Sequence, residues 1–413
     1  MPSLLPIDND LVRNVSSEKA EILAQMLGLN HNGSSLLIHG NLHNHLPHVG
    51  WHGVRAREPA LKPSQILGSA YLLGGSVVHL RATFNTVSSE LETWQPSLVS
   101  IADDDEAHMH LGNALYQRAF VEFFERRLAA LGDDWKRLIF EYLLDSDSPL
   151  LGATVGGCKR RLRALECQSA VEALALTAVD YNALAGVVDL HQIPQGDEPG
   201  ASGALAVLQK IHHNSRFNDV FTSPGVQNTA TILRSEPLRK LTLEYFESLD
   251  FSDTSPETAE ANLRELTKVA VLLLCTISRH EGAPAELQTH KFDFYSRTNP
   301  PSAGLCDVWL LMVLAYIHQQ RPSIKPEILE QTPLSAGSRD PEWRRLRETA
   351  LGATTERGFD PHFTKELRTL WEFSKIWPGE EQMFLKAAVR FEHDFDGWTG
   401  YGREGEERMD VSA

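Results

Sequence analysis

Four histidines lie close together near the N-terminus, within the segment NLHNHLPHVGWH of residues 41–52. On a helix, His45, His48 and His52 would share one face, because side chains three and four positions apart are neighbours. Imidazoles on one face can bind a metal ion together or pass protons along a relay. The alternative is a polar helix start with surface histidines, and Pro47 favours a helix that begins inside the run. The spacing alone leaves both interpretations open.

Two further clusters carry groups that could do chemistry. Pro361 predicts the first turn of a helix, which would place His362 and Lys365 one turn apart on one face. The alternative is a solvated helix face. The second cluster is the basic run of residues 158–163, CKRRLR, in an otherwise acidic protein. Its alternative is a charged helix face that pairs with nearby acids.

The motifs of several familiar cofactor sites are absent from the sequence. No GxGxxG follows a predicted strand and no Walker A sequence occurs, so a Rossmann nicotinamide or flavin site is unsupported. HExxH, GxSxG and the His-x-Asp/Glu pair of iron oxygenases do not occur either. The four cysteines form no CxxC pair, which disfavours a structural zinc site and a disulfide framework. They fit reduced thiols in an intracellular protein, which we expect to be cytoplasmic.

Composition and charge exclude several classes of protein. The chain has 413 residues, of which 42% are hydrophobic and 23% charged, as expected for a chain that buries a sizeable core. Its formal net charge of −16 disfavours nucleic acid and anionic membrane surfaces as partners. The N-terminus shows no secretory signal pattern. The longest apolar run is Val308–Ile317, too short for a bilayer span of roughly 20 residues, so we expect a buried core helix there.

The segments that must position these groups show mainly the apolar spacing of helices. Apolar residues at spacings of three and four predict a helix over residues 115–128, and the pattern resumes over 138–143 after a break at Gly132. Ser255-Pro256-Glu257 is typical of a helix start, with a capping hydroxyl and a proline at the first position. Further core helices are expected at residues 308–317 and 384–391. The strand signals are poor, and residues 34–39 are the only short strand that we expect.

The sequence therefore predicts an all-α fold with one domain over residues 1–413. A soft boundary is allowed near residues 195–203, where the loop composition QGDEPGASG interrupts the helical patterns.

In sequence order, these segments resemble the questin oxidase-like family, found mostly in fungal gene clusters for aromatic polyketides. Its Asn-His-Leu-x-His pattern is similar to Asn44–His48, and its Lys-Phe-Asp-Phe-Phe pattern to Lys291–Tyr295. Its C-terminal Asp-Asp-x-His-x-x-Lys-Leu-x-Arg pattern is similar to Asp360–Arg368. The other matching segments are Tyr116, Phe120, Phe123 and Phe124, Trp135 with Glu141-Tyr142-Leu143, Leu150-Leu151-Gly152, Val171–Ala175, Phe384-Leu385-Lys386 and Trp398–Gly402. The resemblance runs from about residue 40 to 402.

The resemblance implies an all-α enzyme. Members of the family include Baeyer–Villiger-type oxidases that open anthraquinones and an iron dioxygenase whose metal is held by histidines and a carboxylated lysine. By position in the matched motifs, the resemblance implies that His45, His48, His362 and Lys365 are retained parts of that centre.

The chain also departs from the family pattern. The family's His-Pro-Leu-Ile-His-Leu-Gly motif is replaced by residues 158–166, which contain Arg160 and no histidine. The histidine expected after Phe-Asp-Phe-Phe is missing as well, and Arg297 stands in that segment. A guanidinium repels a divalent cation and does not deprotonate to accept one. We therefore infer that the iron site is lost and that no metal is bound.

These residues lead to a functional hypothesis. We expect a helical pocket in which His45, His48, His362, Lys365, Arg160 and Arg297 polarise a substrate oxygen. Trp51, Phe124, Phe294 and Tyr295 would form its aromatic, substrate-binding walls. The leading interpretation is a tailoring enzyme of fungal secondary metabolism that needs neither metal nor redox cofactor. Its reaction would be an intermolecular hetero-Diels–Alder cycloaddition between a tropolone-type polyketide quinone methide and a terpene alkene.

Two alternatives remain open. One is a Baeyer–Villiger-type or iron-dependent oxygenase that cleaves an anthraquinone-like polyketide with NADPH or Fe²⁺. The other is an inactive relative that binds a metabolite. The expected partners are small molecules, with no nucleic acid and no membrane span, and a homodimer is allowed.

Overall fold

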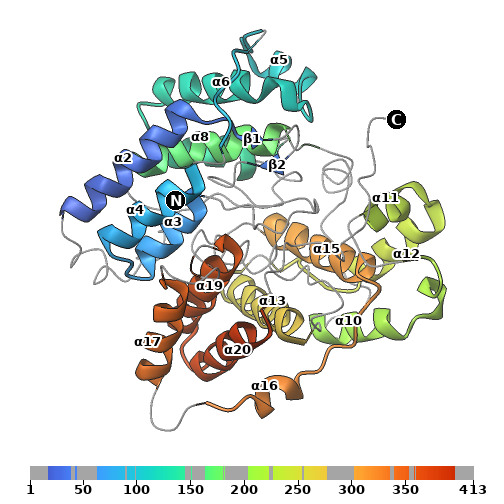
Figure 1. Ribbon diagram of the computed structural model, residues 1–413. Helices are drawn as coiled ribbons and strands as arrows, with labels where there is room; N and C mark the ends of the chain where they lie inside the picture. The colour runs from blue at the N-terminus through green and yellow to red at the C-terminus, as the bar shows by residue number, and fades with distance from the viewer. Residues whose placement is uncertain are drawn as a thin grey trace.

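Helices make up nearly all of the regular structure in the described part of the chain (Figure 1). The computed structural model describes residues 17–38, 42–43, 63–88, 91–97, 99–144, 150, 163–179, 181, 203–222, 227–253, 255–276, 302–334, 339–352, 358 and 360–395. Within these residues the only sheet is one two-stranded ladder. The prediction of an all-α fold is therefore confirmed.

The N-terminal part combines two helices of 17 residues, α2 and α8, with shorter elements. They are α2 (Ser17–Gly33), β1 (Leu37–Ile38), β2 (Leu42–His43), α3 (Pro63–Leu72), α4 (Val77–Ser88), α5 (Asp104–Met109), η1 (Ala114–Tyr116), α6 (Gln117–Ala130), α7 (Trp135–Ile139), the π-helical turn η2 (Phe140–Leu144) and α8 (Arg163–Val179). The structure thus places the predicted helix of residues 115–128 in η1 and α6. The predicted break is confirmed, since Gly132 and Asp133 have φ angles of 64° and 63° and turn the chain there.

The C-terminal part contains the longest helices. Its elements are α10 (Ala204–His213), η4 (Ser215–Phe217), α11 (Gln227–Arg234), α12 (Glu236–Phe246), α13 (Pro256–Thr276), α15 (Ser302–His318), α16 (Glu327–Gln331), α17 (Arg339–Ala350), α19 (Pro361–Ile376) and α20 (Glu381–Asp394). As predicted, α13 begins at Pro256, and the hydroxyl of Ser255 accepts a hydrogen bond of 3.3 Å from the Thr258 amide. The predicted core helices lie in α15 and α20, and among the described residues no helix has the length and apolar character that a bilayer span requires.

The expected strand is much shorter than its sequence pattern. Of the described residues 34–38, Leu37–Ile38 are in β1, which pairs antiparallel with β2 through Leu37 opposite His43 and Ile38 opposite Leu42. An isolated bridge joins Ser34 to Thr93. The first histidine of the N-terminal run, His43, is therefore in a strand. The other three histidines of that run lie outside the described residues.

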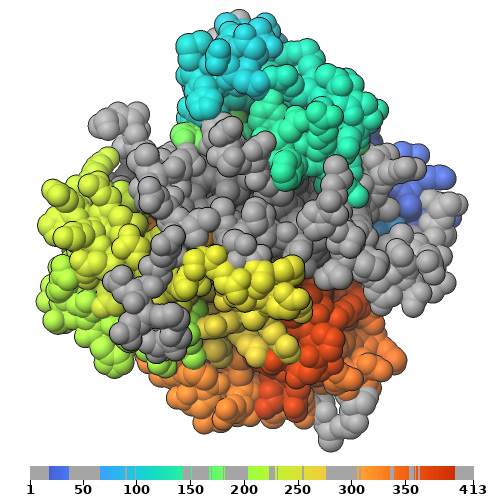
Figure 2. Space-filling model, turned by 180° about the vertical axis from the view of Figure 1, so that it is seen from behind, coloured from blue at the N-terminus to red at the C-terminus, as the bar shows by residue number. Residues whose placement is uncertain are grey.

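Buried apolar side chains form clusters that follow the order of the chain. One cluster lies around α6 and α8, and a larger one combines residues of α10–α13, α15, α17, α19 and α20. A smaller cluster joins α2, α3 and α4. Seen from behind, the cyan-to-teal segments lie at one end of the molecule and the orange segments at the other (Figure 2). Helix α3 packs against α19, and Leu351 contacts both the small cluster and the large one. The proposed domain boundary stays a prediction.

A network of charge-assisted hydrogen bonds joins α17 to α20, two helices of the large cluster. The two terminal nitrogens of Arg345 donate to the two carboxylate oxygens of Glu392, each at 2.7 Å, and Arg345 Nε donates to Glu342 Oε1 at 2.8 Å. These hydrogen bonds raise the pKa of Arg345 further, so the guanidinium stays charged. Since the planar fork matches a carboxylate in two-point contact, lysine cannot reproduce it.

We expect Arg345→Lys to lower the free energy of unfolding by about 1–2 kcal/mol, because it loses charge-assisted hydrogen bonds at a partly exposed site. Urea denaturation measures the change. Arg137→Lys is the matched control, since Arg137 makes only an exposed contact of 2.8 Å with Glu141, four residues on. Equal losses in the two variants would contradict a special contribution from the two-point contact.

Candidate functional site

Helix α19 contains the segment that the sequence analysis marked at residues 360–368, and it starts as predicted. Pro361 is its first residue, and the carboxylate of Asp360 accepts a hydrogen bond of 3.1 Å from the amide of Phe363. Asp360 O also accepts from the amide of Thr364 at 3.2 Å. An acidic cap followed by proline therefore fixes where the helix begins.

The apolar side of α19 belongs to the large core cluster. Its residues recur at helical spacing and are Phe363, Leu367, Leu370 and Phe373, all 0–1% exposed. The rings of Phe363 and Phe391 of α20 are stacked 5.8 Å apart, and those of Phe373 and Phe384 are 5.6 Å apart. This side packs α19 onto α20, as an amphipathic helix requires.

The polar side of α19 is buried as well. We call Lys365, Arg368 and Glu372 the α19 polar stripe, because their spacing of i, i+3 and i+7 places them on one face. Lys365 and Arg368 are each 2% exposed and Glu372 is 4% exposed. An amphipathic helix normally turns such a face to water. Here it is covered instead, so the alternative of a solvated helix face is wrong for Lys365, whereas the side chain of His362 lies outside the described residues.

The burial of the α19 polar stripe determines how its charged groups can interact with a substrate. Charged groups that leave water must be compensated by hydrogen bonds or opposite charges, and none of the three side chains is without a partner. The guanidinium of Arg368 carries five N–H donors and stays protonated, so one contact does not exhaust it. In a site shielded from water, such donors stabilise negative charge on an oxygen more strongly than they do in water.

The structure describes only part of the predicted site. Lys365 is on the α19 polar stripe, and the backbone of His362 lies in the first turn of the same helix. His45, His48, Trp51, Arg160, Phe294, Tyr295 and Arg297 lie outside the described residues. Their predicted roles therefore stay predictions.

Phe124, a predicted wall of the pocket, lies in α6 and is 1% exposed. Its ring meets that of Tyr142 edge-on at 5.1 Å and that of Phe123 at 5.1 Å. These contacts place Phe124 in the cluster around α6 and α8, whereas Lys365 is on a helix of the large cluster. Contact of Phe124 with a substrate stays a prediction.

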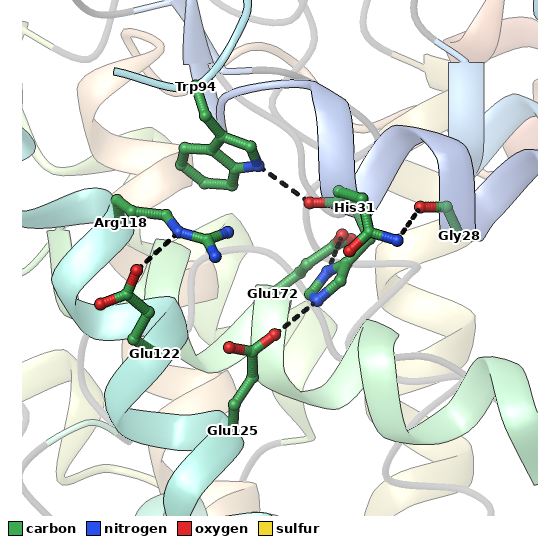
Figure 3. Close-up of polar contacts among 8 residues, drawn as sticks. Gly28, His31, Trp94, Arg118, Glu122, Glu125 and Glu172 are labelled. Atoms are coloured by element: carbon green, nitrogen blue, oxygen red, sulfur yellow. Dashed lines mark hydrogen bonds and ion pairs between the residues drawn. The ribbon is translucent and has the colours of Figure 1, made fainter. Parts of the chain in front are cut away.

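The sequence analysis missed a second group of buried ionisable residues, His31, Glu125 and Glu172, which come from α2, α6 and α8 (Figure 3). Nδ1 of His31 lies 2.7 Å from Oε1 of Glu172, and Nε2 lies 2.9 Å from Oε1 of Glu125. We call these three residues the His31 clamp. Trp94 adds a hydrogen bond of 2.8 Å from its indole nitrogen to the carbonyl of His31.

The two carboxylates determine the charge of His31. Burial alone would lower the pKa of the ring, but the hydrogen bonds and negative charges of Glu125 and Glu172 outweigh burial and raise that pKa to about 9. At pH 7 both ring nitrogens therefore carry protons and donate. The hydrogen bond from His31 in turn lowers the pKa of Glu125, and Arg118 and Arg126 act in the same direction. The clamp ties three helices together with charge-assisted hydrogen bonds.

One sequence signal could have indicated this group. Glu172 is the only charged residue between Gln168 and Val179, a stretch rich in alanine and leucine, and a lone acid in an apolar helix calls for a buried partner. Its partner His31 is 141 positions away in the sequence. Local patterns therefore could not identify the pair.

The described residues do not test the metal prediction. Within the described ranges, no three or more His, Cys, Asp and Glu side chains are grouped in a way that could hold a metal ion. The histidines that the resemblance implies as ligands lie elsewhere, so the expected loss of iron stays a prediction.

Comparison with known proteins places the chain in a family. No curated protein sequence matches it. The family model described as Questin oxidase-like matches residues 63–297, which is more than half of the chain. The matched range extends from α3 through α13 and ends before α19, so the likeness at Asp360–Arg368 rests on the motif alone. The family suggests a tailoring enzyme of secondary metabolism, and the length of the match confirms the resemblance: the chain belongs to the questin oxidase-like family.

Proposed function

We propose that the chain catalyses an intermolecular hetero-Diels–Alder cycloaddition in fungal secondary metabolism without a metal or a redox cofactor. The reactants are a tropolone-type polyketide quinone methide and a terpene alkene. The observation that supports this proposal most is the α19 polar stripe, in which Lys365 and Arg368 are buried on one helix face. Together with the basic residues that replace expected histidines at Arg160 and Arg297, it favours polarisation of a carbonyl over binding of iron.

The reaction balances with the two reactants alone. The quinone methide contributes its carbonyl oxygen and its exocyclic carbon, and the alkene contributes both carbons of its double bond. One C–O and one C–C bond form together, two π bonds are consumed, and no electron, proton or leaving group is exchanged. The protein therefore has two tasks, which are to hold the reactants in contact and to stabilise charge that develops on the oxygen.

The contribution of each task to lowering the activation barrier has a known order of magnitude. Holding two reactants in a reactive arrangement can supply roughly 7–11 kcal/mol of barrier reduction. A hydrogen-bond donor aimed at a developing oxyanion adds about 2.7–4 kcal/mol, and a cycloaddition, in which less charge develops, should use the lower end of that range. In this proposal Arg368 and Lys365 donate to the carbonyl oxygen, with His362, Arg160 and Arg297 as further predicted donors.

The proposal is tested by turnover under argon with a chelator present and no nicotinamide. We expect product to form faster than in a control with heat-inactivated protein, with one stereoisomer in excess. Elemental analysis of protein from iron-supplemented medium should find well below one iron per chain. Turnover that requires oxygen together with iron or NADPH would establish the oxygenase alternative instead. Binding of the quinone methide without any rate increase would identify an inactive relative.

A further inference from the structure

A hollow of about 550 Å³ lies beside the His31 clamp and is separate from the α19 polar stripe. Its lining includes Asn32 at the end of α2, the segment Trp94–Ser97, and Arg118 and Glu122 of α6. The volume lies within the usual range for a small-molecule site. The catalytic proposal makes no use of this hollow.

Hydrogen bonds and a cation–π contact join the side chains of the lining to one another and to α2. The indole nitrogen of Trp94 donates to the carbonyl of His31, and the guanidinium of Arg118 lies 5.1 Å from the Trp94 ring (Figure 3). Arg118 Nε donates to Glu122 Oε1 at 2.9 Å, and the Asn32 amide donates to Gly28 O at 2.9 Å. Because these side chains already hold one another, binding need not order them.

The Arg118–Glu122 pair keeps unused hydrogen-bonding capacity. Among the described residues, no hydrogen bond engages the two terminal nitrogens of Arg118 or the second carboxylate oxygen of Glu122. Both side chains are partly exposed, at 27% and 39%. The hollow therefore offers donors and an acceptor side by side, next to an aromatic ring and the hydroxyl of Ser97, which donates to Val99 O at 2.6 Å and can still accept.

We propose that this hollow binds a neutral polyhydroxylated ring, the chemical class of a glycoside. Each hydroxyl of such a ring both donates and accepts, so two neighbouring hydroxyls can accept from Arg118 and donate to Glu122. The apolar C–H edge of the ring can lie against Trp94. Glu122 balances the charge of Arg118, which disfavours an anion as occupant.

Saturation-transfer NMR tests the proposal with methyl β-D-glucopyranoside and its galacto epimer as probes. We expect transfer to the ring protons of at least one probe, and a signal at least threefold smaller in Arg118→Gln and in Glu122→Gln. The matched control is Arg137→Gln, which breaks another exposed i, i+4 pair with Glu141 and should leave the signal unchanged. Removing such pairs costs little stability, and the thermal midpoint of each variant verifies that it is folded.

Three results would overturn the proposal. They are no transfer to either epimer, equal signals in the wild type and both variants, and stronger binding of sodium benzoate that depends on Arg118. The last result would assign the hollow to an anion. Because none of these measurements involves cycloaddition, they leave the catalytic proposal untouched.

Discussion

Replacing Lys365 with methionine is expected to lower kcat/KM of the cycloaddition at least tenfold, which corresponds to about 1.4 kcal/mol of lost transition-state stabilisation. The amine is 2% exposed on α19, and methionine fills a similar space without a donor. If Lys365 polarises the carbonyl oxygen, the loss comes from the chemical step and leaves the protein folded. Arg368→Met is expected to act in the same direction, because the guanidinium is on the same face.

A matched lysine on the same helix serves as the control. Lys375 is exposed and lies 3.3 Å from the centre of the Trp371 ring, near the end of α19. Lys375→Met should keep full kcat/KM. The rate constants are compared with thermal midpoints, because a buried charge whose partner is removed also costs stability. If activity falls only in proportion to the folded fraction, Lys365 is structural and the polarisation mechanism is wrong.

A loss of stability at alkaline pH is the second large effect that we expect. The folded-state pKa of His31 is raised to about 9, whereas an unfolded chain has an ordinary histidine pKa near 6.5. A raised pKa means that the folded state holds its proton more tightly than the unfolded state does. The stabilisation is therefore fully present below about pH 6.5, declines as the pH rises, and is lost above about pH 9. Its size is about 3 kcal/mol.

Other perturbed groups act outside this pH window, except Lys19, whose pKa is lowered by burial from its ordinary value of 10.5, so that stability rises with pH instead of falling. Burial lowers the pKa of His79, and it lowers that of His318 to about 3, so their stabilisation is present above about pH 6.5 and is lost under acidic conditions. Likewise, the lowered pKa of Glu125 changes the free energy of unfolding only near and below the ordinary value of 4.5. Burial raises the pKa of the Cys275 thiol above its ordinary value of 9.0, so that group costs stability only at higher pH. A fall in stability from about pH 6.5 to 9 therefore reports on His31.

Urea denaturation at pH 6.5, 7.5 and 8.5, below the range in which thiols ionise, measures this effect. The free energy of unfolding of the wild type should fall across the series, whereas that of His31→Gln should be nearly constant, because glutamine does not titrate. His213→Gln is the control, since His213 is exposed and contacts only groups of its own helix end, the carbonyl of Gln209 at 2.8 Å and the ring of His212 at 4.9 Å. A wild-type curve as flat as that of His31→Gln would show that the ring is not held charged between Glu125 and Glu172.

The class of fold can be predicted from the sequence, because helix starts and apolar spacing are local properties. Ser255-Pro256 and Asp360-Pro361 place a capping side chain before a proline, and α13 and α19 begin there. The spacing of Phe120, Phe123 and Phe124 placed a buried face on α6. The strand was overestimated, because pairing needs a partner strand that the pattern of residues 34–39 does not specify.

The family also followed from the sequence, since residue order along the chain is what a family model compares. The sequence indicates only in part which residues have a chemical role. Lys365 was selected by its motif, but its spacing with His362 fits a solvated face equally well. The pattern of α19 shows that one side is polar without showing what covers that side.

Which polar groups are buried depends on how the helices pack. This packing covers the α19 polar stripe, and it brings His31 against Glu125 and Glu172 from positions 94 and 141 residues away. The physical reason is that local spacing fixes which side chains share a helix face, whereas desolvation and charge pairing depend on which helices pack together. A pKa raised to about 9 and a buried guanidinium are consequences of that packing, which no single segment of this chain encodes.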